Sequence, residues 1–168
     1  FALKINRVSF PGQDRWHSKP VPLLGGLAIF TAFTVSFLVF FREKEIFWVL
    51  LLGGVLSALL GLFDDFLKIK PSNKLIGQII IACVTIGLGV KFELGPASLI
   101  SIPITIFWIV GMMNAMNLLD NMDGLAAGVG AIGAGFCALH AALAGQWTVA
   151  TLAVITSGTC LGFLWYNF

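Results

Sequence analysis

Six apolar runs of membrane-spanning length constrain the fold of this chain more than any other feature of its sequence. They cover residues 23–41, 46–63, 75–91, 99–116, 124–143 and 148–167. A hydrophobic stretch of about 20 residues is long enough for an α-helix to cross a bilayer. Because 58% of the residues are hydrophobic and 11% are charged, the chain cannot bury its apolar surface against itself. We therefore predict an all-α fold, a polytopic membrane bundle of about six transmembrane helices, in which residues 1–168 form a single integral membrane domain.

The charged residues lie mainly in alternate connectors between these runs. Residues 1–22, 64–74 and 117–123 hold seven of the ten Lys and Arg residues and five of the eight acids. Cytoplasmic loops of membrane proteins carry an excess of Lys and Arg, so we expect these three segments on the cytoplasmic face. The net charge of +2 is too small to indicate nucleic-acid binding.

Two adjacent acids, Asp64 and Asp65, end the second apolar run. A carboxylate in hydrocarbon costs roughly 2.5 to 3.5 kcal/mol on insertion scales, so acids at the edge of a span need a reason. Two neighbouring negative charges are unfavourable unless a positive charge is close. Either Lys68 and Lys70 or a divalent ion supplies this positive charge. The doublet is thus either a solvated helix end beside its lysines or a metal-binding and catalytic site.

A second polar group follows the fourth run. Asn117, Asp120, Asn121 and Asp123 recur at intervals of three and four residues, which brings side chains to one face of a helix or of its last turn. Oxygen ligands without His or Cys suit Mg²⁺, which binds one or two carboxylates together with substrate phosphates. An ordinary turn is the alternative, because Asn, Asp and Gly are common turn residues. The density of ligands favours the metal and phosphate site.

Two lysines fit a phosphate site. Lys74 stands just before the run 75–91, where a helix N-terminus attracts anions, and Gln78 follows one turn later. Lys19 precedes two prolines and a glycine pair at the start of the first run. Lysines that flank a membrane helix are more often plain anchors, and this remains the alternative for both.

Three stretches, taken together, resemble the polyprenyl-phosphate N-acetylhexosamine-1-phosphate transferases, glycosyltransferase family 4. They are HSKPVPLLGG at 17–26, GLFDDFLKIKPSNKLIGQ at 61–78 and NAMNLLDNMDGLAAG at 114–128. The first is more similar to the initiators of teichoic acid and O-antigen (lipopolysaccharide) synthesis than to the phospho-N-acetylmuramoyl-pentapeptide translocase of peptidoglycan synthesis, which is the alternative. The motifs correspond to about half of a typical family member, so we assign function to the full-length protein and expect this portion alone to be inactive.

The resemblance implies a reaction, its substrates and its location. Polyprenyl phosphate, usually undecaprenyl phosphate, attacks the β-phosphorus of a UDP-amino sugar such as UDP-N-acetylglucosamine. Polyprenyl-diphosphate-sugar forms and UMP leaves. The reaction would use Mg²⁺, with Mn²⁺ as the alternative ion, at the cytoplasmic face of the bacterial inner membrane. It would be the first membrane step of cell-wall or other envelope glycan synthesis.

The resemblance also implies roles for individual residues. Asp64 and Asp65 match paired aspartates that either deprotonate the lipid phosphate or hold the metal, and Asn117 matches a polar residue near the metal and diphosphate. The remaining matched residues are expected to bind substrate, through the nucleotide pocket or the phosphates: Asp120, Asn121, Asp123, Lys19 and Lys74. Asn121 stands where many members have Gly.

Two readings from other classes stay open. An ion-coupled membrane transporter also places ionisable groups among spans, but its acids should lie near mid-membrane rather than at one face. A purely structural membrane module leaves the polar clusters unexplained. Gly53, Ser57 and Gly61 recur at steps of four, which is typical of close helix packing in lipid, either within one bundle or in a homodimer.

Overall fold

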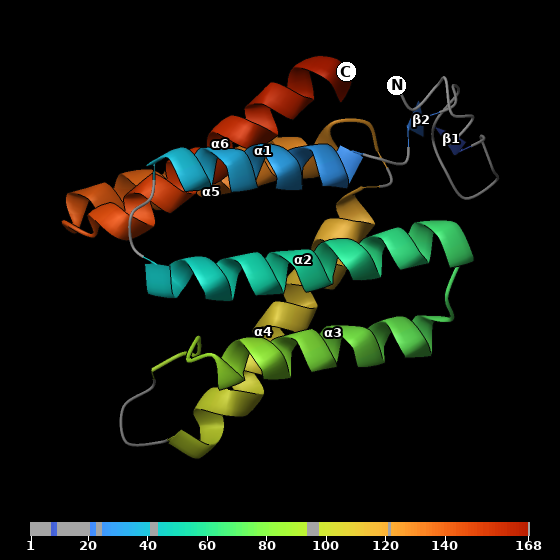
Figure 1. Cartoon of the computed structure of the whole chain (residues 1–168), viewed down its shortest axis with the longest axis horizontal. Coiled ribbons are helices and arrows are strands. Elements are labelled where there is room, and N and C mark those ends of the chain that lie inside the picture. Colours follow the sequence, from blue (N-terminus) through green and yellow to red (C-terminus); the bar gives the residue numbers. More distant parts are fainter. Residues whose placement is uncertain are drawn as a thin grey trace. The chain divides into compact units, whose positions relative to one another are not determined.

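The computed structural model describes residues 8–9, 21–22, 25–40, 44–93, 98–120 and 122–167. The all-α prediction is confirmed, because this part of the chain forms six helices (Figure 1). They are α1 (Gly25–Phe40), α2 (Lys44–Leu67), α3 (Pro71–Gly87), α4 (Ser98–Leu119), α5 (Leu125–Leu143) and α6 (Trp147–Asn167). Two short strands, β1 (Val8–Ser9) and β2 (Val21–Pro22), pair antiparallel, and the sequence did not predict them.

Each predicted apolar run corresponds to one of these helices. Four stretches are long and apolar enough to cross a membrane: Trp48–Leu67, Leu99–Leu119, Leu125–Leu143 and Trp147–Tyr166. Helix α1 is also apolar but has 16 residues, and α3 has 17. Large apolar side chains are exposed on all six helices, as expected where lipid or further protein covers them.

Three helices extend beyond the apolar runs that predict them. Helix α2 continues to Leu67, α4 continues to Leu119, and α3 begins at Pro71. The apolar run ends where the membrane interior ends, but backbone hydrogen bonding continues as long as the helix does. The polar residues at these ends therefore lie on rigid helical turns.

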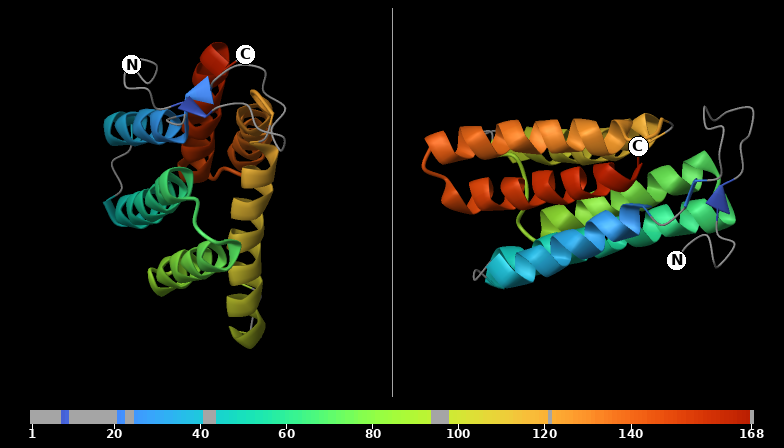
Figure 2. Two further views of the ribbon diagram at one scale, coloured as in Figure 1. Left: turned by 90° about the vertical axis from the view of Figure 1, so that its right-hand side faces the viewer. Right: turned by 90° about the horizontal axis from the view of Figure 1, so that it is seen from above.

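The chain forms two compact units, residues 1–42 with 117–168 and residues 43–116. In the first unit, α6 packs against both α5 and α1 (Figure 2). Small residues of α5 make the close approach to α6 possible, and four of them are buried: Ala127, Ala131, Ala138 and Ala141. The Ser157 hydroxyl of α6 donates a hydrogen bond to the Ala131 carbonyl at 2.9 Å.

In the second unit, α2 and α3 run side by side and α4 crosses them at a steep angle (Figures 1 and 2). Gly77 allows the contact between α2 and α3, because a Cβ atom at this position would lie 2.8 Å from Leu60 Cδ1. Beyond the end of α3, the Phe92 amide donates to Thr105 Oγ1 of α4 at 3.0 Å. Packing thus joins α3 to α2, and a hydrogen bond joins the segment after α3 to α4.

Candidate active site

The acidic doublet lies in the last turn of α2, and Asp64 forms an ion pair with a lysine of α3. Lys74 Nζ of α3 donates to Asp64 Oδ2 at 2.5 Å. The Lys74 and Asp64 side chains are 18% and 25% exposed, so the pair is partly shielded from solvent. Asp65 is exposed, as expected for adjacent residues on a helix, whose side chains point about 100° apart. Among the described residues, the cation paired with Asp64 is Lys74 and not Lys68 or Lys70, the lysines that lie nearer in the sequence.

A sharp connector between α2 and α3 makes this ion pair possible. The Lys68 amide donates to the Asp64 carbonyl at 2.9 Å and closes the last turn of α2. Lys68 then adopts a left-handed backbone conformation, with φ 46°, which costs a non-glycine residue roughly 1 to 2 kcal/mol. Pro71 stands at the start of α3, where its fixed φ favours the first helical turn. Two residues ten apart in sequence are thereby brought into contact.

Lys74 occupies an unusual electrostatic position. It lies in the first turn of α3, whereas the sequence placed it just before the helix. The positive end of the helix dipole disfavours a cation there, and the same end attracts anions. The Asp64 carboxylate therefore compensates both the ammonium and the helix terminus. A phosphate group that approached this end of α3 would meet both positive features as well.

Gln78 does not point to a phosphate site, contrary to the sequence-based expectation. Its side chain is 2% exposed and pairs reciprocally with Asn114 of α4. Gln78 Nε2 donates to Asn114 Oδ1 at 3.2 Å, and Asn114 Nδ2 donates to Gln78 Oε1 at 2.7 Å. Sequence reasoning missed Asn114, although a second Asn three residues before Asn117 was a visible signal.

The second polar group begins on α4 and continues into the turn before α5. Asn117 lies in the last helical turn, while Asp120 and Asp123 follow the helix end, and all three are exposed. Gly124 is buried and left-handed, with φ 71°, so it leads the chain into α5 without the strain that a side chain would cause. The predicted cluster is therefore split between a helical turn and an irregular turn.

The predicted site residues fall in different parts of the chain. It brings Asp64 and Lys74 together in the second unit, with Asp65 adjacent. Asn117, Asp120 and Asp123 belong to the first unit. Lys19 and Asn121 lie outside the described residues.

The doublet suits a divalent cation that is shared with a substrate. Among the described residues, no group of three or more His, Cys, Asp or Glu side chains could hold a metal ion. An all-protein metal cage is therefore absent from that part of the chain. Mg²⁺ commonly uses one or two carboxylates and completes its octahedron with water and phosphate oxygens. Asp64 and Asp65 offer this number and kind of ligand.

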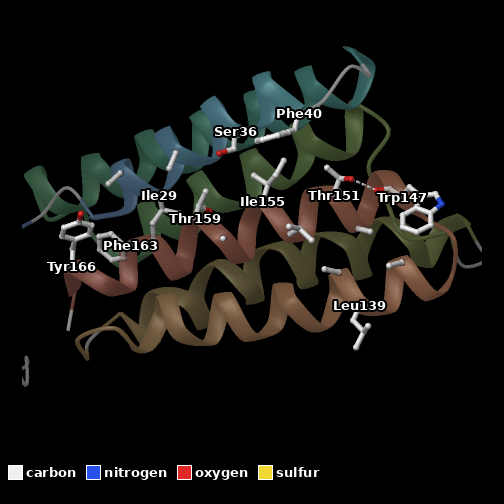
Figure 3. Close-up of a pocket in the computed structure, with 18 residues that line it drawn as sticks. Ile29, Ser36, Phe40, Leu139, Trp147, Thr151, Ile155, Thr159, Phe163 and Tyr166 are labelled. Carbon is white, nitrogen blue, oxygen red and sulfur yellow. Dashed lines mark hydrogen bonds between the residues drawn. The ribbon is translucent and has the colours of Figure 1, made fainter.

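An apolar groove of about 1080 Å³ lies in the first unit, lined by residues of α1, α5 and α6 (Figure 3). Phe163 and Tyr166 lie at one end of it and Trp147 at the other. The polar atoms of its lining side chains include the hydroxyl groups of Ser36, Thr151, Thr159 and Tyr166, and no charged residue lines it within the part of the chain that the structure describes. The groove suits hydrocarbon or a packed helix.

Comparison with known proteins identifies the class. The model of the family named Glycosyl transferase family 4 matches residues 47–168. A probable undecaprenyl-phosphate N-acetylglucosaminyl 1-phosphate transferase of Bacillus subtilis is 33% identical over 99% of this chain and 49% of its own length. A decaprenyl-phosphate N-acetylglucosaminephosphotransferase of Mycolicibacterium smegmatis is 30% identical over 99% of this chain and 48% of its own length. A phospho-N-acetylmuramoyl-pentapeptide-transferase of Thermoanaerobacter sp. is 34% identical over 87% of this chain and 52% of its own length.

The chain therefore belongs to glycosyl transferase family 4, as its sequence motifs indicated. The prediction of a phosphoglycosyltransferase is confirmed at the level of the family. The chain spans about half the length of the curated relatives it matches. No solved structure matches it significantly.

Proposed function

We propose that the full-length protein transfers N-acetylhexosamine 1-phosphate from a UDP-amino sugar to a polyprenyl phosphate and releases UMP. The observation that carries the proposal is the acidic doublet in the last turn of α2, with the Lys74 ammonium on Asp64. This arrangement lies at the end of an apolar helix long enough to cross a membrane. Such a position suits one substrate that is a lipid and another that is water-soluble.

The chemistry is a displacement at phosphorus. An oxygen of the lipid phosphate forms a bond to the β-phosphorus of the UDP-sugar, and the bond between that phosphorus and the bridging oxygen of the α-phosphate breaks. UMP departs with the electron pair. Both reactants are anions, so cationic groups must lower their repulsion and stabilise the charge that develops on UMP. Lys74, which lies at a helix N-terminus, is the described residue best placed to do this.

Two roles remain for the aspartates. If the lipid phosphate arrives as a monoanion, Asp65 or Asp64 accepts its proton as the new bond forms. Alternatively, the two carboxylates hold Mg²⁺, or Mn²⁺ in its place, with Asn117 as a further ligand. When bound, the ion would neutralise diphosphate charge and polarise the phosphorus under attack. We assign nucleotide and phosphate binding to the other predicted residues: Lys19, Lys74, Asp120, Asn121 and Asp123.

The names of the relatives support N-acetylglucosamine 1-phosphate as the transferred group, with phospho-N-acetylmuramoyl-pentapeptide as the alternative. Undecaprenyl or decaprenyl phosphate would be the acceptor. We further propose a single integral domain in the bacterial inner membrane, with the site on the cytoplasmic face, and a homodimer as its assembly. Teichoic acid or O-antigen synthesis is the proposed pathway, on the strength of HSKPVPLLGG at residues 17–26.

A UMP-release assay on the full-length protein tests the proposal. The purified protein receives undecaprenyl phosphate and, in turn, UDP-N-acetylglucosamine, UDP-N-acetylgalactosamine and UDP-N-acetylmuramoyl-pentapeptide. Each donor is assayed with Mg²⁺, with Mn²⁺ and with a chelator. We expect UMP from UDP-N-acetylglucosamine only when lipid phosphate and a divalent ion are both present. UMP from the pentapeptide donor alone would move the protein to the peptidoglycan branch, and no UMP from any donor would reject the proposal.

Membership of glycosyl transferase family 4 favours the transferase over an ion-coupled transporter. A flux experiment separates the two directly. Proteoliposomes that lack polyprenyl phosphate should show no ion-driven uptake of any of the three UDP-linked donors. Uptake that follows an ion gradient in these vesicles would support the transporter.

A further inference from the structure

One turn of α3 carries two polar links to two different helices. Lys74 bonds to Asp64 of α2, and four residues later Gln78 pairs with Asn114 of α4. Residues four apart lie on one face of a helix, separated by about one turn. The two links therefore belong to a single segment of α3, and whatever fixes Gln78 also fixes the backbone from which Lys74 extends.

The amide pair is strongly constrained. Gln78 has the most completely buried large side chain among the described residues. A buried amide without a hydrogen-bond partner destabilises the fold, and Asn114 supplies both an acceptor and a donor for Gln78. Asn114 is itself held, because its Nδ2 also donates to the Val110 carbonyl at 2.8 Å. Two antiparallel hydrogen bonds between the same side chains fix the register of the helices as well as their separation.

A shift of α3 by one residue would move it about 1.5 Å along its axis and break at least one of these bonds. Apart from the ion pair of Lys74 with Asp64, the contact of α3 with α2 does not give the same precision. There, Gly77 faces the end of the Leu60 side chain, and apolar contacts of this kind have no directional preference. The hydrogen bond from Phe92 to Thr105 restrains only the segment beyond the far end of α3. The amide pair is thus a directional contact between α3 and α4, one turn from Lys74.

We propose that the Gln78–Asn114 amide pair is a positioning device, which sets the register of α3 on α4 and thereby holds the Lys74 ammonium on Asp64. Neither amide needs to touch a substrate. Its effect on activity rests on the function proposed above, whereas its effect on Lys74 does not. The two effects can therefore be measured separately.

The first experiment uses four variants of the full-length protein: Gln78→Leu, Asn114→Leu, the double variant with both leucines, and the exchange Gln78→Asn with Asn114→Gln. Two properties are measured without substrate: the melting temperature in detergent, and the rate at which acetic anhydride modifies Lys74, followed by mass spectrometry. A lysine released from its carboxylate is more accessible to the reagent. Thr85→Val is the control, because the Thr85 hydroxyl donates to the Ile81 carbonyl within α3.

We expect each single leucine to lower the melting temperature and to raise the acetylation rate of Lys74 several-fold. The double leucine should recover the melting temperature, because neither amide is then left unpaired, but Lys74 should stay reactive. The exchange variant restores both properties. If Lys74 reactivity simply follows the melting temperature, or if the exchange variant is as reactive as the single variants, the pair only holds the helices together and the proposal is wrong. The double leucine and the exchange variant decide this even where a single variant does not fold.

The second experiment measures UMP release. A displacement of about 1 Å at a reacting group can cost about 100-fold in rate. We expect kcat/KM to fall about 10- to 100-fold in the double leucine and to lie within about 3-fold of the wild type in the exchange variant. On a Lys74→Ala background, Gln78→Leu should cause no further loss, because it acts through Lys74. If the losses in kcat/KM from Gln78→Leu and Lys74→Ala add fully in the double variant, the amide pair does not act through Lys74 and this part of the proposal is wrong. If the wild type releases no UMP at all, the proposed function fails, while melting and acetylation still decide the amide pair.

Discussion

Two helix contacts in this chain are built on different principles. Helix α5 meets α6 through small residues, and the hydrogen bond between them from Ser157 to Ala131 uses a backbone carbonyl. Helix α3 meets its neighbours through side chains that carry charge or amide groups, at Lys74 and Gln78. In lipid, apolar surface gives helices little reason to associate, so both contacts need another source of stability. Close packing supplies it in the first case and directed polar bonds in the second.

The comparison teaches where chemistry can reside. A contact made of alanines tolerates small shifts along the helices, because dispersion has no preferred direction. A contact made of an ion pair and two amide hydrogen bonds does not, because each bond needs its own distance and angle. We therefore expect changes at the polar contact of α3 to reduce activity, and changes at the α5–α6 contact to reduce stability alone.

The largest effect should come from the acidic doublet. Asp64→Asn and Asp65→Asn keep the shape of each side chain but remove its charge and its ability to accept a proton or bind a divalent ion. We expect UMP release to fall at least about 100-fold in each variant. Glu93→Gln, which neutralises an exposed acid beyond the far end of α3, is the matched control. Normal turnover in both aspartate variants would remove the catalytic assignment.

The second-largest effect on activity should come from substitution of Lys74. Lys74→Ala removes the ammonium from Asp64 and from the N-terminus of α3, and kcat/KM for the UDP-sugar should fall about 100-fold. Lys74→Arg keeps the charge with a different shape, so we expect part of the activity to return. Lys91→Ala, at an exposed position after α3, should resemble the wild type. If Lys74→Ala is as active as Lys91→Ala, Lys74 has no role in the reaction and serves only as a membrane anchor.

A packing change within the polar contact should have an intermediate effect. At Gly77 even a Cβ atom would lie 2.8 Å from Leu60 Cδ1, so Gly77→Leu must push α3 away from α2. Overpacking costs typically about 1 to 3 kcal/mol, and it should also separate Lys74 from Asp64. We expect a lower melting temperature together with a lower kcat/KM. Gly87→Leu, where a Cβ atom meets no heavy atom within 4 Å, is the control on the same helix.

The smallest effect should come from the α5–α6 contact. Ser157→Ala removes the hydrogen bond to the Ala131 carbonyl, and such bonds between membrane helices contribute about 0.6 kcal/mol on average. Thermal unfolding in detergent should shift slightly, while the kcat and KM of the folded protein stay unchanged. Thr151→Ala, which removes a bond within α6, serves as the control. A marked loss of kcat in Ser157→Ala would contradict the separation between packing and polar contacts.

The positions of the helices and of the polar clusters could be predicted from the sequence, because both depend on local composition. All six helices fall on the apolar runs, and Asp64, Asp65 and Asn117 lie at helix ends as expected. The small-residue series was a weaker guide. Gly53 faces Thr85 of α3, whereas a Cβ atom at Gly61 would meet nothing within 4 Å. A step of four residues defines one face of a helix, but it does not say whether another helix covers that face.

What the sequence determined by itself is the number of helices, their approximate ends and the kind of ligands at those ends, since hydrophobic run length and residue chemistry are local properties. Only the tertiary structure decided which side chains meet. It assigned Lys74 rather than Lys68 or Lys70 to Asp64, and it paired Gln78 with an asparagine 36 residues away instead of leaving it for a phosphate. The reason is physical: these contacts depend on how rigid helices cross and turn, and on the left-handed residue Lys68 between two of them. None of these is encoded in the spacing of any single segment.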